Sequence, residues 1–277
     1  MKFKSTIFHA FIYIILVIGI LLILFPIYLT AVTAFKSAEM TAQNFFNLPP
    51  RLYLDNFKTV FSNSRFPVYF FNSVIVTVIS VGIIAVFIPA VSYSIARKFN
   101  KLYYRLLYYA IVGGIFVPFQ VIMIPEVKLV SSLHMLSRAG IIVLYVSFAL
   151  AGNVFLMVGY LKTVPLELEE SAFMDGCSVF KTYVRIIYPL IQPMTATIVI
   201  LACLWIWNDF LLPLVILYKS DKVWTLPLFQ YNFRSQYTFD YNLAFASFFA
   251  SIIPITILYA FMQKYIISGL TQGAIKS

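Results

Sequence analysis

Long apolar runs alternate along the chain with short polar segments. About six of these runs reach the roughly 20 residues that a helix needs to cross the roughly 30 Å hydrocarbon layer of a bilayer. Membrane β-strands would instead alternate apolar and polar positions over about 10 residues. The pattern therefore predicts an all-α integral membrane protein with about six transmembrane helices in one domain over residues 1–277. The helices are expected near 8–33, 72–95, 104–125, 139–161, 190–218 and 242–263.

Composition supports this prediction. Of the 277 residues, 62% are hydrophobic and 11% are charged, and the mean hydropathy is +0.91. Soluble domains have about 45–50% apolar and about 25% charged residues. The net charge of +10 comes from basic residues that lie between the apolar runs. These positions favour contact with water and lipid headgroups rather than with nucleic acid.

The basic residues also predict the orientation in the membrane. The N-terminal tail carries Lys2 and Lys4, and the short loop at 97–105 carries four basic residues and no acid. Short loops rich in lysine and arginine remain in the cytoplasm. We therefore expect a multi-pass protein with both termini cytoplasmic. The segment at 162–189 is then the only sizeable cytoplasmic loop.

The segment at 162–189 contains the signals of a helix–turn–helix. Pro165 suits the first turn of a helix, and the glutamates that follow it suit a helix N-terminus. Gly176 can end this helix in a left-handed conformation, and Ser178 can cap a second helix that Pro189 ends. The pattern alone fits either an interfacial connector or a docking element for a soluble partner.

The same segment contains a family motif. Residues Glu170–Gly176 read Glu-Ser-Ala-Phe-Met-Asp-Gly, and a proline follows thirteen residues later. This run resembles the EAA motif of bacterial ABC importer permeases, which reads Glu-Ala-Ala, two variable residues and Asp-Gly, with a proline after a short amphipathic stretch. Ser171 and Cys177 stand where alanine is common in the motif, and both are small.

Further motifs resemble the carbohydrate branch of this family, similar to the smaller membrane subunit of the maltose transporter. They are Asn72-Ser73, the WNDFLLP segment at 207–213, the TLPL segment at 225–228 and the chain ending at 269–276. Glu126 and Arg138 place charge where that branch is neutral. The outer vestibule is therefore expected to differ from that of the branch.

The resemblance implies that the 162–189 loop is a coupling helix. In that family the loop seats in a groove on a cytoplasmic ATPase subunit. ATP binding closes two such subunits, and the loop converts this closure into helix rocking and alternating access. The docking residues carried over by position are Glu170, Ser171, Ala172, Asp175 and Gly176. The acidic residues would either pair with basic groups of the ATPase or cap the helix.

The resemblance also implies further partners and a location. A second related permease would complete the pathway, and a periplasmic or extracellular solute-binding protein would deliver substrate onto 34–71 and 219–241. The location would be the cytoplasmic membrane of a bacterium.

ATP chemistry is expected on another chain. The sequence has no Walker phosphate loop and no Ser/His, paired-Asp or HExxH constellation, so we expect no enzyme activity. We expect no cofactor or metal here, with ATP and Mg²⁺ on the partner ATPase.

Asn208 and Asp209 are the candidate pathway residues. Asp209 falls within the fifth apolar run, and a carboxylate inside a membrane indicates function by default. Roles in the pathway or at a subunit interface remain open beside a position at the outer headgroups. The nearby Trp205, Trp207 and Phe210 suit either sugar stacking or an interfacial aromatic belt.

The expected function is that of a sugar or oligosaccharide permease. Importers of glycerol-phosphate or polyols share these motifs and remain an alternative. A carrier that needs no ATP is a second alternative, but it would leave the 162–189 loop unexplained and would require inverted repeats or several intramembrane charges.

Overall fold

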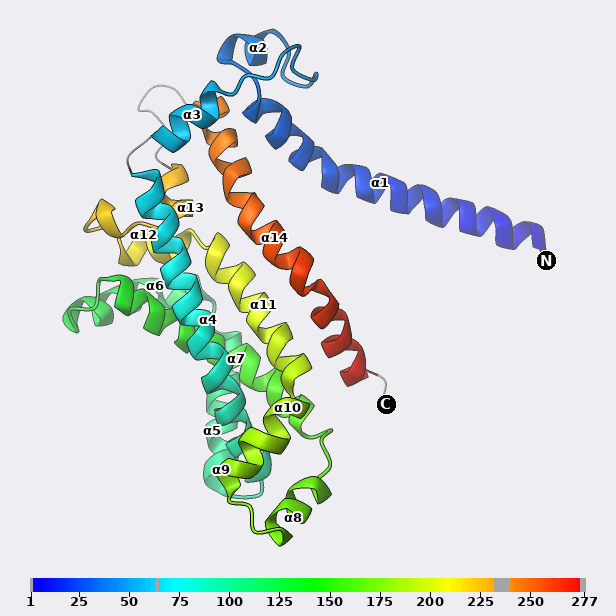
Figure 1. Cartoon of the computed structure of the whole chain (residues 1–277), viewed down its shortest axis with the longest axis vertical. Coiled ribbons are helices and arrows are strands. Elements are labelled where there is room, and N and C mark those ends of the chain that lie inside the picture. The colour runs from blue at the N-terminus through cyan, green and yellow to red at the C-terminus, as the bar shows by residue number, and fades with distance from the viewer. Residues whose placement is uncertain (1, 63–64, 232–239, 275–277) are drawn as a thin grey trace. The chain divides into compact units, whose positions relative to one another are not determined.

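The computed structural model describes residues 2–62, 65–231 and 240–274. Over these residues the chain is helical and contains no strand (Figure 1). Four helical stretches among them are long and apolar enough to cross a membrane. They are Phe11–Ala34 within α1 (Lys2–Ala34), α4 (Phe66–Arg97), α7 (Arg138–Leu161) and Tyr241–Phe261 within α14 (Tyr241–Ala274).

Two further pairs of helices qualify only as bent spans. The first pair, Leu102–Phe116 and Phe119–Ser132, is bent by 110°; it consists of α5 (Leu102–Gly113) with a 3₁₀ turn, followed by α6 (Phe119–Ser132). The second pair, Val179–Leu190 and Gln192–Asn208, is bent by 73° and contains α11 (Gln192–Asn208). The described residues therefore include four helices that are long and apolar enough to cross a membrane, or up to six if each bent pair is one span.

The prediction of continuous helices at 104–125 and 190–218 is therefore wrong in detail. The first is interrupted at Pro118, which has an extended ψ of 135° and lacks the N–H that would continue the ladder. The second ends at Asn208, where the following Asp209 has an extended ψ of 128°, and α12 (Leu211–Ile216) is a separate short helix. Apolar composition indicates membrane depth but does not reveal these breaks.

Residue contacts divide the chain into two units. The first comprises Met1–Pro67 and Phe229–Pro254 and contains α1, α2 (Ala38–Gln43), α3 (Asp55–Ser62) and the start of α14. Amide side chains hold it together. Asn56 donates to the carbonyls of Ala34 and Lys36 at 2.9 and 2.7 Å. Asn242 donates to the same Lys36 carbonyl at 2.8 Å.

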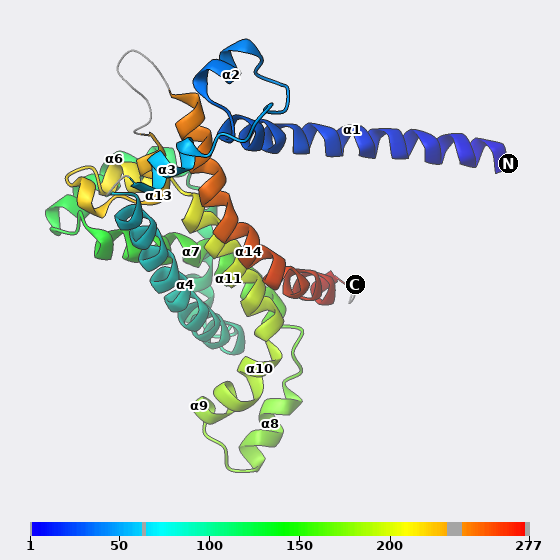
Figure 2. The same cartoon turned by 45° about the horizontal axis from the view of Figure 1, so that its top comes forward.

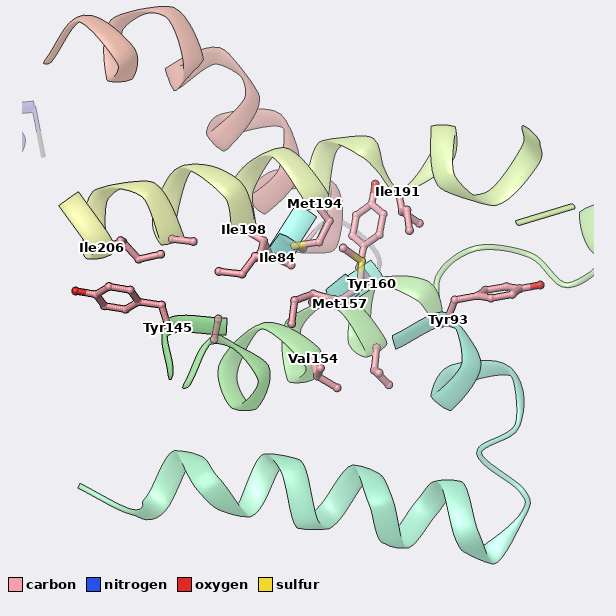
Figure 3. Close-up of a cluster of buried hydrophobic side chains, with 14 of the residues drawn as sticks. Ile84, Tyr93, Tyr145, Val154, Met157, Tyr160, Ile191, Met194, Ile198 and Ile206 are labelled. Atoms are coloured by element: carbon pink, nitrogen blue, oxygen red, sulfur yellow. The ribbon is translucent and has the colours of Figure 1, made fainter. Parts of the chain in front are cut away.

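The second unit comprises Val68–Leu228 and Ile255–Ser277. Its buried core joins side chains of α4, α7 and α11, including Ile84, Val154, Met157 and Ile198 (Figure 3). Many large apolar side chains on the same helices are exposed. Exposed apolar surface on this scale is expected for helices that face lipid or other membrane subunits.

Candidate functional site

The 162–189 segment forms two short helices joined by a tight turn (Figure 2). The first helix, α8, covers Glu167–Met174, and the second, α9, covers Val179–Thr182. Gly176 adopts a φ of +78° in the turn. Ser178 caps α9 by accepting a hydrogen bond from the Lys181 N–H at 3.4 Å. The predicted glycine stop and serine cap are both confirmed.

The prediction for the end of this segment is wrong. Pro189 does not end the second helix, because α9 continues through a π-helical turn at Tyr183–Ile187 into α10 (Tyr188–Leu190). The chain bends at Ile191 instead. A π-turn inserts an extra residue into the helix, and such turns are frequent at functional sites.

The residues expected to dock an ATPase are divided between surface and interior. Ala172 is buried, and the other four are exposed. Among these four, the Ser171 hydroxyl donates to the Glu167 carbonyl at 2.8 Å. Glu170 lies in the first turn of α8, where the helix dipole favours a negative charge. Asp175 lies at the opposite end, where the dipole disfavours one. Stabilisation of the helix end therefore accounts for a carboxylate at Glu170 but not for one at Asp175.

Apolar side chains surround the same turn. Met174 and Phe180 are 89% and 76% exposed, and Phe173 and Val179 are also exposed. The tip of the helix–turn–helix therefore presents apolar side chains together with the carboxylates of Glu170 and Asp175. Such a combination is typical of a protein-binding surface.

A buried ion pair that the sequence did not predict anchors α8. Glu169 is only 4% exposed. Its Oε1 accepts a hydrogen bond from Arg97 Nε at 2.5 Å, and its Oε2 accepts one from the Tyr93 hydroxyl at 2.7 Å. The one available signal was spacing: Glu169 lies three residues before Ala172, on the same helix face. From the sequence, Arg97 is expected only to belong to the basic loop that sets orientation.

Asp209 lies at the break between α11 and α12. Its Oδ1 accepts a hydrogen bond from the Leu211 N–H at 3.0 Å, and its Oδ2 accepts one from the Tyr145 hydroxyl at 2.9 Å. The carboxylate therefore stabilises the start of α12 and ties it to α7. Asn208 is exposed, and within the described part of the chain its amide donates locally, to the Leu204 carbonyl at 2.8 Å.

A cavity of about 360 Å³ opens beside Asp209. Its lining combines aromatic rings, small residues and two polar side chains: Phe119, Phe148, Ala149, Gly152, Asn153, Trp205, Asp209, Leu211 and Leu212. Trp205 is 42% exposed, and its ring stands perpendicular to that of Tyr145, with centroids 5.3 Å apart. The structure thus places Asp209 in a cavity but leaves Asn208 outside its lining.

A polar cluster lies near the start of α4. Arg138 Nη1 donates to Asn72 Oδ1 at 2.9 Å, and Asn72 Nδ2 donates to the carbonyls of Lys222 and Trp224, each at 2.9 Å. Ser73 Oγ accepts from the Leu226 N–H at 2.8 Å. Arg138 therefore binds the asparagine that holds residues 222–224, while Ser73 holds Leu226.

Comparison with known proteins places this architecture in a family. The family model described as "Binding-protein-dependent transport system inner membrane component" matches residues 82–272. A crystal structure of a bacterial ABC transporter involved in the import of the acidic polysaccharide alginate contains a chain with the same fold. The TM-score is 0.83 at 24% identity, covering 95% of this chain and 97% of that one.

Curated relatives match over almost their whole length. The multiple sugar-binding transport system permease protein MsmG of Streptococcus mutans is 44% identical, covering 100% of both chains. The probable starch degradation products transport system permease protein AmyC of Thermoanaerobacterium thermosulfurigenes is 37% identical, covering 97% of this chain and 98% of that one. The arabinooligosaccharides permease AraQ of Bacillus subtilis is 31% identical, covering 92% of each. The chain therefore belongs to the family of inner membrane components of binding-protein-dependent transport systems.

Proposed function

We propose that this chain is the permease subunit of an ATP-driven ABC importer that moves a sugar or oligosaccharide across the bacterial cytoplasmic membrane by alternating access. The observation that carries the proposal is the match over 92–100% of this chain to permeases named for multiple sugars, starch degradation products and arabinooligosaccharides. The proposal includes one permease domain over residues 1–277. Each bent pair counts as one of six spans, and both termini are cytoplasmic.

The helix–turn–helix of α8 and α9 is the proposed coupling element. Its surface residues Glu170, Ser171, Asp175 and Gly176 would contact an ATPase subunit, while the buried Ala172 packs the helix onto the permease. The exposed Asp175 at a helix C-terminus supports this assignment, because a basic group on a partner would compensate its unfavourable position. ATP and Mg²⁺ would reside on the ATPase dimer.

Two further partners complete the proposed importer. The apolar stretch Phe11–Ala34 buries none of its most apolar window within the chain, so lipid and a second permease would cover it. The family description also supports a solute-binding protein on the outer face, where it would contact 34–71 and 219–241. Residues 63–64 and 232–239 of these segments lie outside the described residues.

The cavity beside Asp209 is the proposed contact site for the sugar in this subunit. The exposed face of Trp205 offers a flat apolar surface for the C–H face of a sugar ring. The Asn153 amide and the remaining lone pairs of Asp209 can bind hydroxyl groups. Asn208, just outside the lining, would face the pathway or the second permease.

The charge of the same cavity supports a neutral substrate over an anionic one. Among the described residues that line it, Asp209 is charged and none is basic. An anionic substrate such as glycerol-phosphate would be repelled by this carboxylate in a region of low dielectric constant. A neutral sugar or polyol suits the cavity better.

Reconstitution tests the proposal. The chain would be co-purified with its second permease and ATPase, placed in liposomes with internal ATP, and supplied with labelled sugars and the binding protein. Uptake should require hydrolysable ATP and the binding protein, and it should survive a protonophore. Uptake without ATP that a protonophore abolishes would instead establish the ATP-independent carrier.

A further inference from the structure

The three glutamates of α8 have different surroundings. Glu167 and Glu170 are exposed, whereas the carboxylate of Glu169 is enclosed between α8 and the last turn of α4. Each of its oxygens has a donor on α4, namely Arg97 Nε at 2.5 Å and the Tyr93 hydroxyl at 2.7 Å. Buried charges require such pairing, and loss of one partner leaves an uncompensated charge. The position of α8 is thus tied to that of α4.

Arg97 connects more than two helices. Its Nη1 donates to the carbonyl of Leu161, the last residue of α7, and its Nη2 donates to the carbonyl of Val164 in the connection to α8, both at 3.2 Å. One guanidinium group therefore fixes the ends of α4 and α7 and the entry to α8. Its planar, multidentate geometry makes this contact directional.

Tyr93 extends the connection to the second arm of the helix–turn–helix. Its ring lies 5.0 Å from that of Tyr183 at an interplanar angle of 34°, and Tyr183 begins the π-turn. The Tyr183 hydroxyl is buried and has no hydrogen-bond partner among the described residues. π-Turns are frequent at functional sites, and an unpaired buried hydroxyl is a local cost in stability. Tyr93 lies at the opposite end of the core from Tyr145 (Figure 3).

Helix α4 can carry a displacement at this end across the membrane. It is one unbroken helix over its 32 residues from Phe66 to Arg97. Near its other end, Asn72 bonds Arg138 and the 222–224 backbone. Arg97 and Asn72 thus attach the two ends of one helix to the coupling segment and to the opposite side of the unit.

We propose that Glu169, with Arg97 and Tyr93, is the contact through which the coupling helix moves α4. The three are positioning residues, and the inference rests on the proposed function, in which the tip of α8 and α9 binds an ATPase. The exposed Glu170 and Asp175 then determine how tightly the ATPase binds. Glu169, Arg97 and Tyr93, the buried trio, determine how much sugar is transported for each ATP hydrolysed.

The experiment compares binding, hydrolysis and transport in one reconstituted complex. Glu169→Gln keeps the shape of the side chain and removes its charge, and Tyr93→Phe removes one hydroxyl. Matched controls are Glu167→Gln and Tyr103→Phe, which alter exposed side chains of the same kinds. The readouts are ATPase recovered on co-purification, the rate of ATP hydrolysis, and sugar accumulated per ATP.

Glu169→Gln should bind the ATPase normally and hydrolyse ATP at a rate within about twofold of the wild type, yet lose about tenfold in sugar per ATP. Tyr93→Phe should lose less, and the double variant should resemble Glu169→Gln alone, because both act through one contact. The controls should match the wild type. If Glu169→Gln folds poorly, Tyr93→Phe alone still tests the amount of sugar transported per ATP.

Two results would overturn the inference while the proposed function stands. One is normal sugar per ATP in both trio variants. The other is loss of ATPase binding in step with transport, which would make Glu169 a docking residue. Failure of the wild-type chain to recover an ATPase is a different result, because it refutes the proposed function and the inference with it.

Discussion

Asn72 and Arg138 lie 66 residues apart in sequence and are joined by a 2.9 Å hydrogen bond from Nη1 to Oδ1. The same asparagine amide binds the carbonyls of Lys222 and Trp224. We predict that Asn72→Ala lowers the free energy of unfolding by about 2 kcal/mol, because it removes the amide that two partly buried carbonyls and Arg138 bind. Thermal unfolding in detergent measures this loss. Asn47→Ala, at an exposed asparagine, should leave the midpoint unchanged.

Gly176 is required by the turn between α8 and α9. An added Cβ would meet no atom within 4 Å, so the cost of Gly176→Ala comes from the φ of +78° alone. We predict a loss of about 1 kcal/mol, and a smaller loss for Gly176→Asn because asparagine tolerates this conformation better. Gly159→Ala in α7, where a Cβ also has space, is the matched control. Equal losses for alanine and asparagine at 176 would argue against the conformational explanation.

Lys36 gives a pH-dependent stability. The side chain is 1% exposed, its ammonium donates to the carbonyls of Asn44 and Phe45, and burial lowers its pKa from 10.5. The unfolded chain then holds the proton more strongly than the folded chain, so the Lys36 contribution to stability rises as pH approaches 10.5.

Lys36→Met isolates this contribution. The difference in unfolding free energy between the wild type and Lys36→Met should shift in favour of the wild type between about pH 7.5 and about pH 10. Chemical unfolding at both values measures it. A difference that stays constant would show that Lys36 has the same pKa in both states.

Trp205 should determine sugar affinity in this subunit. Trp205→Ala removes the proposed stacking surface, so we predict about a tenfold higher half-saturating sugar concentration for uptake, corresponding to a loss of about 1.4 kcal/mol. Trp205→Phe should recover part of the affinity. Trp207→Phe at the neighbouring buried tryptophan is the control and should leave the half-saturating concentration unchanged. An unaltered value in Trp205→Ala would place the sugar contacts elsewhere.

The sequence predicted the positions of the apolar helices better than the bends within them. Apolar composition marks residues that leave water, and each expected run corresponds to a helix or a bent pair of helices. The bends at Pro118 and Ile191 depend on how neighbouring helices accept the freed backbone groups. In membrane helices proline is tolerated without a break, as at Pro89 within α4. The proline positions alone therefore did not locate the bends.

The features of the α8–α9 segment that depend on residues close in sequence were predictable. Gly176 and Ser178 act within a few residues of themselves, and both roles were readable from the sequence. The pairing of Glu169 with Arg97 spans 72 residues and depends on how the end of α4 lies against α8. In a single sequence, a basic residue near a span end indicates only orientation.

The central claim is that α8 and α9 attach this permease to an ATPase. Affinity purification of the tagged chain in mild detergent, followed by mass spectrometry, tests it directly when repeated with Gly176→Pro. Proline fixes φ near −65° and cannot adopt the observed +78°. We predict that the wild type recovers a second permease and an ATPase, and that the variant loses the ATPase alone. Recovery of the chain by itself in both cases, or equal ATPase recovery from both, would contradict it.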